Sequence, residues 1–211
     1  MQISATLLGE NGTTMIKTRK DFPCPFEEYS CRVLPDWIDA NGHMNIALYG
    51  VVFDRGNYAA CDALDLGEDY VERAQHGVFA AETHILYFRE LHLDDLIRVR
   101  TQIVSVDDKR LHFAHEIHHC KTSERAAAQE IMYLHVNLKT RRVAPFLDDV
   151  RAGIAEAAKA HEQLPVPEWC GRRIVSARTP STPSFQHLSS LNRRGASCRA
   201  RPHSESPRPA R

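Results

Sequence analysis

The sequence predicts an α+β fold in which one long apolar helix lies beside an antiparallel sheet. Residues 46–66 carry apolar side chains at helical spacing, and four strand patterns follow one another between residues 78 and 138. The turns between these strands are too short for crossover helices, so consecutive strands are expected to pair antiparallel. An amphipathic helix over residues 148–162 then completes two layers around one core.

The strand patterns are short runs of alternating apolar and polar residues. They cover residues 78–91, 96–106, 111–119 and 126–138. An earlier strand is predicted over residues 29–38, where Pro35 near its end suits an edge or a bulge. In the run 78–91, period-two alternation places Glu82 and His84 on one face of the sheet and Tyr87 on the other.

The long helix is expected to begin at Ile46, with Asn45 as its N-cap, and to end before Gly67. Apolar residues spread around much of its surface, so we expect it to be largely buried, with Gly56 as a weak point. The helix over residues 148–162 carries aspartates in its first turn, as the helix macrodipole favours.

The composition is that of a soluble globular protein, since 43% of the 211 residues are hydrophobic and 26% are charged. No run of 18 apolar residues is present, which excludes a membrane-spanning helix. The first 20 residues lack the apolar stretch of a secretory signal. Six cysteines are irregularly spaced without a CxxC pair, so neither a zinc knuckle nor a disulfide scaffold is expected. These features predict a cytoplasmic protein with free thiols and no membrane partner.

The formal net charge of zero conceals an asymmetry along the chain. Residues 172–211 hold nine arginines and one acid, a net of +8, whereas residues 1–171 carry 18 basic and 26 acidic residues, a net of −8. The tail is rich in arginine, serine and proline and is predicted to be disordered. A dispensable tail is favoured over one that binds nucleic acid, an anionic membrane or the protein's own acidic body. The chain is therefore divided into an extension over residues 1–27, a domain over residues 28–171 and this tail.

The segment Asp39–Asn45 is the richest polar cluster in the chain and lies between the first strand and the long helix. It combines a carboxylate, a glycine that allows close backbone approach, a histidine and the start of a helix. Free amides at a helix start stabilise developing negative charge, and a nearby carboxylate suits acyl transfer by direct attack or by activation of water. The alternative is a capped helix start, in which Asp39 and Asn45 only satisfy backbone groups.

The segment PDWIDANGHMNIALYGVVFDR resembles the signature of the hotdog-fold acyl-CoA thioesterases related to 4-hydroxybenzoyl-CoA thioesterase. The matching residues are Asp39, Gly42, His43, Met44, Asn45 and Tyr49. The resemblance covers roughly residues 28–171 and implies a hotdog fold, in which the sheet wraps the long helix. It also implies hydrolysis of a small acyl-CoA thioester without a metal or redox cofactor, in a homodimer or homotetramer.

The resemblance implies a role for each matching residue. Asp39 would be the nucleophile or general base, and His43 and Asn45 would hold the loop in shape. The backbone amides of Asn45 and Ile46 would polarise the thioester carbonyl. Because the family forms its site at a subunit interface, Glu82 and His84 are expected to reach the site from a partner chain.

A narrower resemblance is to betainyl-CoA thioesterases, including the thioesterase part of some L-carnitine dehydrogenase fusions. It rests on GVFAAETHILYFRELHLDD, on residues 108–112 and on LPVPEWCGR, and it implies betainyl-CoA as the substrate. A trimethylammonium group has a fixed charge and no N–H donor, so it favours aromatic faces beside a carboxylate. The candidates are Trp37, Tyr49, Phe53, Glu82 and Tyr87, although these aromatic residues are more often part of a core.

Lys109 and Arg110, in a predicted hairpin, are candidates for binding the phosphates of coenzyme A, although charged hairpin residues are usually only solvated. Several histidines crowd two strands, but the alternation splits them between the sheet faces, so no metal site is expected. The sequence has neither the Gly-x-Ser-x-Gly motif of serine hydrolases nor a nucleotide fingerprint or P-loop.

Two alternative functions stay open. Hotdog enoyl-CoA hydratases resemble this chain but place a histidine five residues after the aspartate. Here His43 follows Asp39 by four residues and Gly42 replaces the proline of that pattern, which favours the thioesterase. A non-catalytic acyl-CoA-binding module is disfavoured by the complete set of polar residues over residues 39–45.

Overall fold

The computed structural model describes residues 22–174 of the chain. Contacts divide the chain into residues 1–172 and residues 173–211, and the fold below is that of the first unit. Most of the predicted extension at residues 1–27 and of the predicted tail at residues 172–211 lies outside the described residues. The three-part division therefore stays a prediction.

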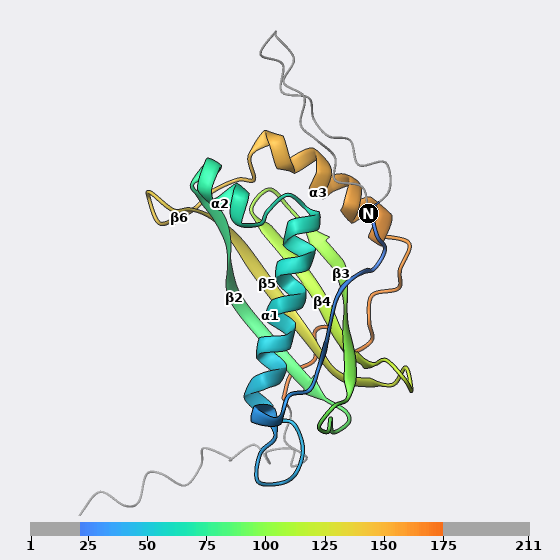
Figure 1. The fold of residues 1–211 in the computed structure, drawn as a ribbon. Coiled ribbons are helices and arrows are strands. Elements are labelled where there is room, and N and C mark those ends of the chain that lie inside the picture. The colour runs from blue at the N-terminus through green and yellow to red at the C-terminus, as the bar shows by residue number, and fades with distance from the viewer. Residues whose placement is uncertain (1–21, 175–211) are drawn as a thin grey trace, which may run out of the picture. The chain divides into compact units, whose positions relative to one another are not determined.

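One antiparallel sheet forms the body of the domain, and the long helix α1 lies across one face of it (Figure 1). The strands lie in the order β1 (Phe26–Arg32), β3 (Leu96–Val106), β4 (Arg110–His119), β5 (Arg125–Asn137) and β2 (His76–Tyr87), and β6 (Arg142–Val143) pairs with β5. Short connections join β3 to β4 and β4 to β5, which explains the antiparallel pairing of these strands. The expected pairing of β2 with the next strand, β3, is wrong, because β2 pairs with β5 instead. The arrangement is the α+β hotdog fold, as predicted.

Within residues 22–174 the helical segments are η1 (Pro35–Trp37), α1 (Ile46–Ala63), α2 (Glu68–Ala74) and α3 (Asp148–His161). The side chain of Asn45 accepts the N–H of Ala47 at 2.9 Å, which confirms it as the N-cap of α1. Within residues 22–174, no helix is long and apolar enough to cross a membrane.

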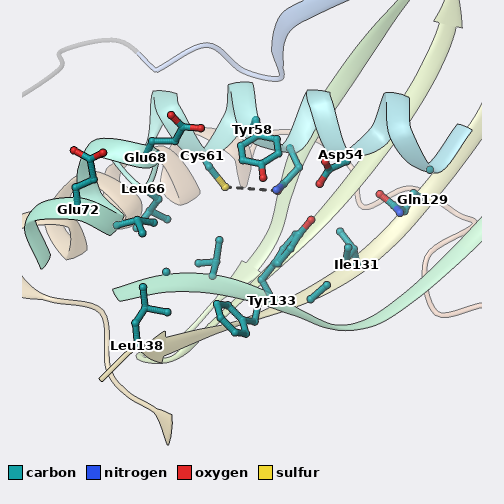
Figure 2. A pocket seen from close by; sticks show the side chains of 18 residues that line it. Asp54, Tyr58, Cys61, Leu66, Glu68, Glu72, Gln129, Ile131, Tyr133 and Leu138 are labelled. Atoms are coloured by element: carbon teal, nitrogen blue, oxygen red, sulfur yellow. Dashed lines mark hydrogen bonds between the residues drawn. The ribbon is translucent and has the colours of Figure 1, made fainter. Parts of the chain in front are cut away.

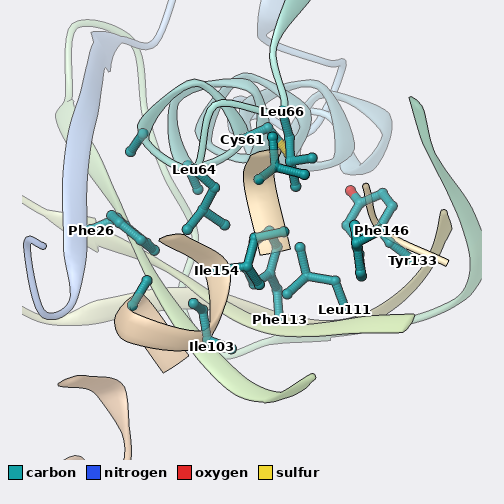
Figure 3. Close-up of a cluster of buried hydrophobic side chains, with 14 of the residues drawn as sticks. Phe26, Cys61, Leu64, Leu66, Ile103, Leu111, Phe113, Tyr133, Phe146 and Ile154 are labelled. Carbon is teal, nitrogen blue, oxygen red and sulfur yellow. The ribbon is translucent and has the colours of Figure 1, made fainter. Parts of the chain in front are cut away.

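Two clusters of buried apolar side chains fill the space between the sheet and the helices. In the larger one, Leu64 after the end of α1, Ile154 of α3 and Phe113 of β4 pack together (Figure 3). In the second, Phe53 of α1 packs near Val99 of β3. The packing fixes the sheet against α1 and so determines where the residues before α1 are held.

Several element boundaries differ from the predictions. The first strand ends at Arg32 rather than at residue 38, because Pro35 starts η1 instead of ending a strand. Helix α1 ends at Ala63 rather than Leu66, since Asp65 takes a left-handed φ of 57°. The elements α2 and β6 were not predicted, because seven and two residues are too few to show a periodicity.

The expectation that α1 is largely buried is wrong for the described chain. Its side chains at Ile46, Val51 and Tyr58 are 64%, 44% and 48% exposed. The sheet covers only one side of the helix, so apolar residues on its other side face outward. Such an exposed apolar face indicates a binding surface.

Gly56, expected to be a weak point, is a position where α1 packs tightly against β3. A Cβ atom at this position would lie 2.4 Å from Cγ1 of Val99. We therefore expect Gly56→Ala to lower the free energy of unfolding by about 1–3 kcal/mol through overpacking, despite the better helix propensity of alanine.

The control is Gly50 in the same helix, where a Cβ would meet nothing within 4 Å. Gly50→Ala should raise the free energy of unfolding by up to about 1 kcal/mol. Urea unfolding measures both, and equal shifts would contradict the close packing.

Candidate active site

The segment Asp39–Asn45 forms a closed loop between η1 and α1. An isolated bridge between Ile38 and Met44 joins its ends. Inside the loop, the Asp39 N–H donates to the His43 carbonyl and the Gly42 N–H donates to the Asp39 carbonyl, both at 3.0 Å. Gly42 has a φ of +85°, a left-handed conformation that glycine adopts readily. The loop backbone therefore holds Asp39 in a fixed position.

The loop is also fastened to the rest of the domain. Met44 is 2% exposed, and its N–H donates to the Leu91 carbonyl at 2.7 Å. The Asn45 N–H donates to the Trp37 carbonyl at 2.8 Å. These contacts place the loop at the N-terminus of α1, where the partial positive charge of the helix lies.

Only one of the two amides expected to polarise a thioester carbonyl is free. The Asn45 N–H is already bonded to Trp37, so its predicted role is corrected. The Ile46 N–H, at the first position of α1, has no acceptor among residues 22–174. An unpaired N–H at a helix start is a donor for negative charge that develops during a reaction.

A pocket of about 500 Å³ opens beside the loop. It is lined by Asp39, Asn41, His43, Met44, Ile46, Tyr49 and residues 87–90. The Oδ1 atom of Asp39 accepts the Asn41 N–H at 2.8 Å, which orients the carboxylate. Nε2 of His43 lies 3.8 Å from Oε1 of Glu90. The pocket is thus lined both by an oriented carboxylate and by Ile46, the residue whose N–H is free, as acyl transfer requires.

Two tyrosines form one wall of this pocket. The rings of Tyr49 and Tyr87 meet edge to face with their centroids 5.2 Å apart. Burial raises the pKa of both hydroxyl groups, so both side chains are neutral at physiological pH. The other aromatic candidates lie elsewhere: Phe53 is fully buried in the core, and Trp37 packs against the same cluster. Only Tyr49 and Tyr87 of the predicted aromatic set therefore line the site.

The family model for the thioesterase-like superfamily matches residues 33–154, which include the loop, α1 and the strands β2 to β6. The chain belongs to this superfamily. A betainyl-CoA thioesterase of Pseudomonas aeruginosa is 37% identical over 146 residues, which are 69% of this chain and 92% of that protein. The chain is therefore a thioesterase.

Solved structures agree with this assignment. A putative thioesterase from Pseudomonas putida KT2440 is 32% identical with a TM-score of 0.64, covering 73% of this thioesterase and 98% of that chain. A hypothetical protein from Staphylococcus aureus, solved in complex with CoA, is 28% identical with a TM-score of 0.68, covering 72% of this chain and 95% of that one.

Glu82 and His84 do not line the Asp39 pocket within one chain of the thioesterase. They lie opposite Met132 and Glu130 of β5, whereas the alternate residue Ile131 faces the core beneath α1. Opposed residues share a face of an antiparallel pair, so Glu82 and His84 project from the face away from α1. Their predicted contact with substrate stays a prediction about a partner chain.

Lys109 and Arg110 lie at the opposite end of the sheet from Asp39. Arg110 pairs with Leu134 of β5, whereas Tyr87 at the Asp39 pocket pairs with Ala127. Seven residues of β5 separate these positions, which is about 23 Å. Arg110 also forms an ion pair with Asp107 at 2.6 Å. Within one chain, these residues therefore do not line the Asp39 pocket, and their contact with the phosphates of coenzyme A stays a prediction.

The clustered histidines have protein partners. Nε2 of His112 lies 3.0 Å from Glu130, and Nε2 of His118 lies 2.9 Å from Glu116. His115 is buried, and burial lowers its pKa to about 3, so it is neutral in the core. In the described part of the chain, no group of three or more His, Cys, Asp or Glu side chains is placed to hold a metal ion.

Sequence reasoning did not place the segment Phe88–Glu90 in the site, although it lines the Asp39 pocket. These residues were read as the end of a strand, but β2 ends at Tyr87. The adjacent charged pair Arg89 and Glu90 interrupts the alternation and was the available signal. Two adjacent charged residues that interrupt a strand's alternation therefore indicated here that the strand had ended and that a loop lining the site had begun.

Proposed function

We propose that this thioesterase hydrolyses betainyl-CoA to betaine and coenzyme A. The observation that supports this substrate is the 37% identity to the Pseudomonas aeruginosa betainyl-CoA thioesterase over 92% of that protein. Sequence similarity over nearly the whole relative favours a shared acyl group over a shared fold alone.

Asp39 is the reacting carboxylate in this proposal. In one route it attacks the carbonyl carbon, the thiolate of coenzyme A leaves, and water cleaves the resulting mixed anhydride. In the other route it takes a proton from the water that attacks the carbonyl carbon. In both, the Ile46 N–H stabilises the developing oxyanion, and His43 and Asn45 hold the loop. Neither route uses a metal or redox cofactor.

We also propose that the enzyme acts as a homodimer or homotetramer in the cytoplasm. Strand β2 lies at an edge of the sheet, and its Tyr87 is 45% exposed on the face that carries α1, whose own apolar side is also exposed. A second copy would cover this apolar surface. The five cysteines among residues 22–174 are free thiols, which suits a reducing compartment.

The test is thiol release from a panel of betainyl-, acetyl-, short branched, long-chain and 4-hydroxybenzoyl-CoA. We expect kcat/KM for betainyl-CoA to exceed that for each other ester by about tenfold or more. Preference for another ester would discard betaine but keep the thioesterase. Loss of the enoyl absorbance of crotonyl-CoA without thiol release would instead indicate a hydratase, and bound but intact esters would indicate a binding module.

A further inference from the structure

A second hollow, which we call the α1 pocket, lies along α1, with α2 and strands β2 and β5 as its other walls (Figure 2). Its volume is about 610 Å³. One side of α1 contributes Gly50, Asp54, Asn57, Tyr58 and Cys61, and β5 contributes Gln129, Ile131 and Tyr133. None of its lining residues belongs to the Asp39 pocket. The α1 pocket is therefore a separate space.

The charges that line the α1 pocket are all negative. Asp54, Glu68 and Glu72 line it, and no lysine, arginine or histidine does. Asp54 forms no ion pair with any residue in the described range. Such a one-signed concave surface attracts cations.

A buried amide in the α1 pocket lacks a protein partner. The side chain of Gln129 is only 7% exposed, lines the pocket and makes no hydrogen bond to the described residues. Asn57 is equally buried, and its oxygen receives only a long contact of 3.6 Å from the Cys61 thiol. The amide of Gln129 is therefore free to bond a ligand or water held in the pocket.

Aromatic groups stand beside the free carboxylate. Figure 2 shows Asp54 and Tyr58 on α1 above the strand that carries Tyr133. All four of Asp54, Tyr58, Cys61 and Tyr133 line the pocket, and burial, with a smaller effect of the other three groups, raises the pKa of the Tyr133 hydroxyl far above its usual range. Tyr58 is 48% exposed, so part of its ring is open to a ligand.

We propose that the α1 pocket binds a trimethylammonium group, with Asp54 supplying the charge and Tyr58 and Tyr133 the aromatic faces. A methylated cation has no N–H to donate, so one carboxylate and two rings suffice to hold it. The amide of Gln129 is free to bond the carboxylate, carbonyl or hydroxyl attached to such a cation. Two sources supply the group: a free methylated amine, or the acyl part of the substrate.

The geometry separates these sources. Ile46 and Asp54 are eight residues apart on α1, about 12 Å along the helix axis. The nitrogen of a betainyl group lies only two bonds from its carbonyl carbon, so a thioester held at Ile46 does not reach Asp54 of the same chain. If the α1 pocket holds the acyl part of the substrate, the thioester must lie at the Asp39 loop of a second copy of the chain, and this case rests on the proposed function. If the pocket holds a free methylated amine, one chain is enough.

The direct test is calorimetric titration with choline and with its neutral isostere 3,3-dimethylbutan-1-ol. We expect choline to bind the wild-type protein about tenfold more tightly than the alcohol, and Asp54→Asn to remove most of that preference. Tyr58→Leu, at a half-exposed position, should weaken choline binding severalfold.

The matched control is Glu156→Gln on α3, which removes one exposed charge that lines no pocket described above. Equal affinity for the two probes, or an Asp54→Asn protein that is folded and binds choline normally, would overturn the proposal.

Subunit mixing distinguishes the two sources. Asp39→Asn and Asp54→Asn chains are co-expressed, and betainyl-CoA hydrolysis by the mixed oligomer is compared with that of each variant alone. In the mixed oligomer, one site combines the intact Asp39 of the Asp54→Asn chain with the intact Asp54 of the Asp39→Asn chain. Recovery of activity would therefore show that the pocket holds the acyl group. If activity does not recover although the wild-type protein binds choline, the pocket holds a free amine. If wild-type protein does not hydrolyse betainyl-CoA, the proposed function fails while the choline result stands.

Discussion

Asp39→Asn should lower kcat for acyl-CoA hydrolysis by about a hundredfold to ten-thousandfold, the contribution of a general base or more. Asparagine has the same shape, and its Oδ1 atom can still accept the Asn41 N–H that now orients the carboxylate. The loop should therefore keep its conformation while losing its negative charge and basicity. Thiol release at saturating substrate measures kcat, and thermal unfolding checks that Tm is unchanged.

The control for this variant is Asp36→Asn, which removes an exposed carboxylate three residues earlier in η1. It should retain wild-type kcat, because Asp36 does not line the pocket. A comparable loss of activity in both variants would point to damage of the loop rather than of the chemistry. An Asp39→Asn enzyme with more than half the wild-type kcat would remove Asp39 from the mechanism.

Much of the fold could be predicted because its elements carry their own periodicity. The strand predicted over residues 96–106 is β3 with the same bounds, and the helix predicted from Ile46 begins there. The exposure of one side of α1 could not be predicted in this way, because apolar residues at an outer surface give the same pattern as apolar residues in a core. Periodicity reports apolar faces, and only the three-dimensional arrangement shows which of them is covered.

The site was predictable where it is local in sequence. Residues 39–45 hold the carboxylate, the glycine turn and the helix start within one segment, and the structure keeps them together. The Asn45 amide was assigned wrongly because its acceptor, the Trp37 carbonyl, belongs to a segment read as a strand. Lys109 could not be placed either, since strand register decides which end of the sheet a hairpin occupies.

Ile46→Pro should lower kcat by about a hundredfold to a thousandfold, the usual cost of removing one oxyanion donor. Proline is well tolerated at the first position of a helix, where its missing N–H breaks no helical hydrogen bond. Asn45 already has φ −60° and ψ 140°, the extended conformation favoured before proline. The Ile46 side chain is 64% exposed, so its loss removes little packing. The variant therefore deletes the proposed donor with little change to the rest of α1.

The matched control is Ile46→Val, which changes the same side chain but keeps the N–H. It should retain wild-type kcat, and both variants should unfold near the wild-type Tm. A donor that acts only on the developing oxyanion affects kcat and leaves KM unchanged, whereas a donor that binds the ground-state carbonyl would raise KM. An Ile46→Pro enzyme with normal kcat would show that the oxyanion is stabilised elsewhere. A fall in kcat confined to the proline variant, at unchanged KM, would place the developing negative charge at the start of α1.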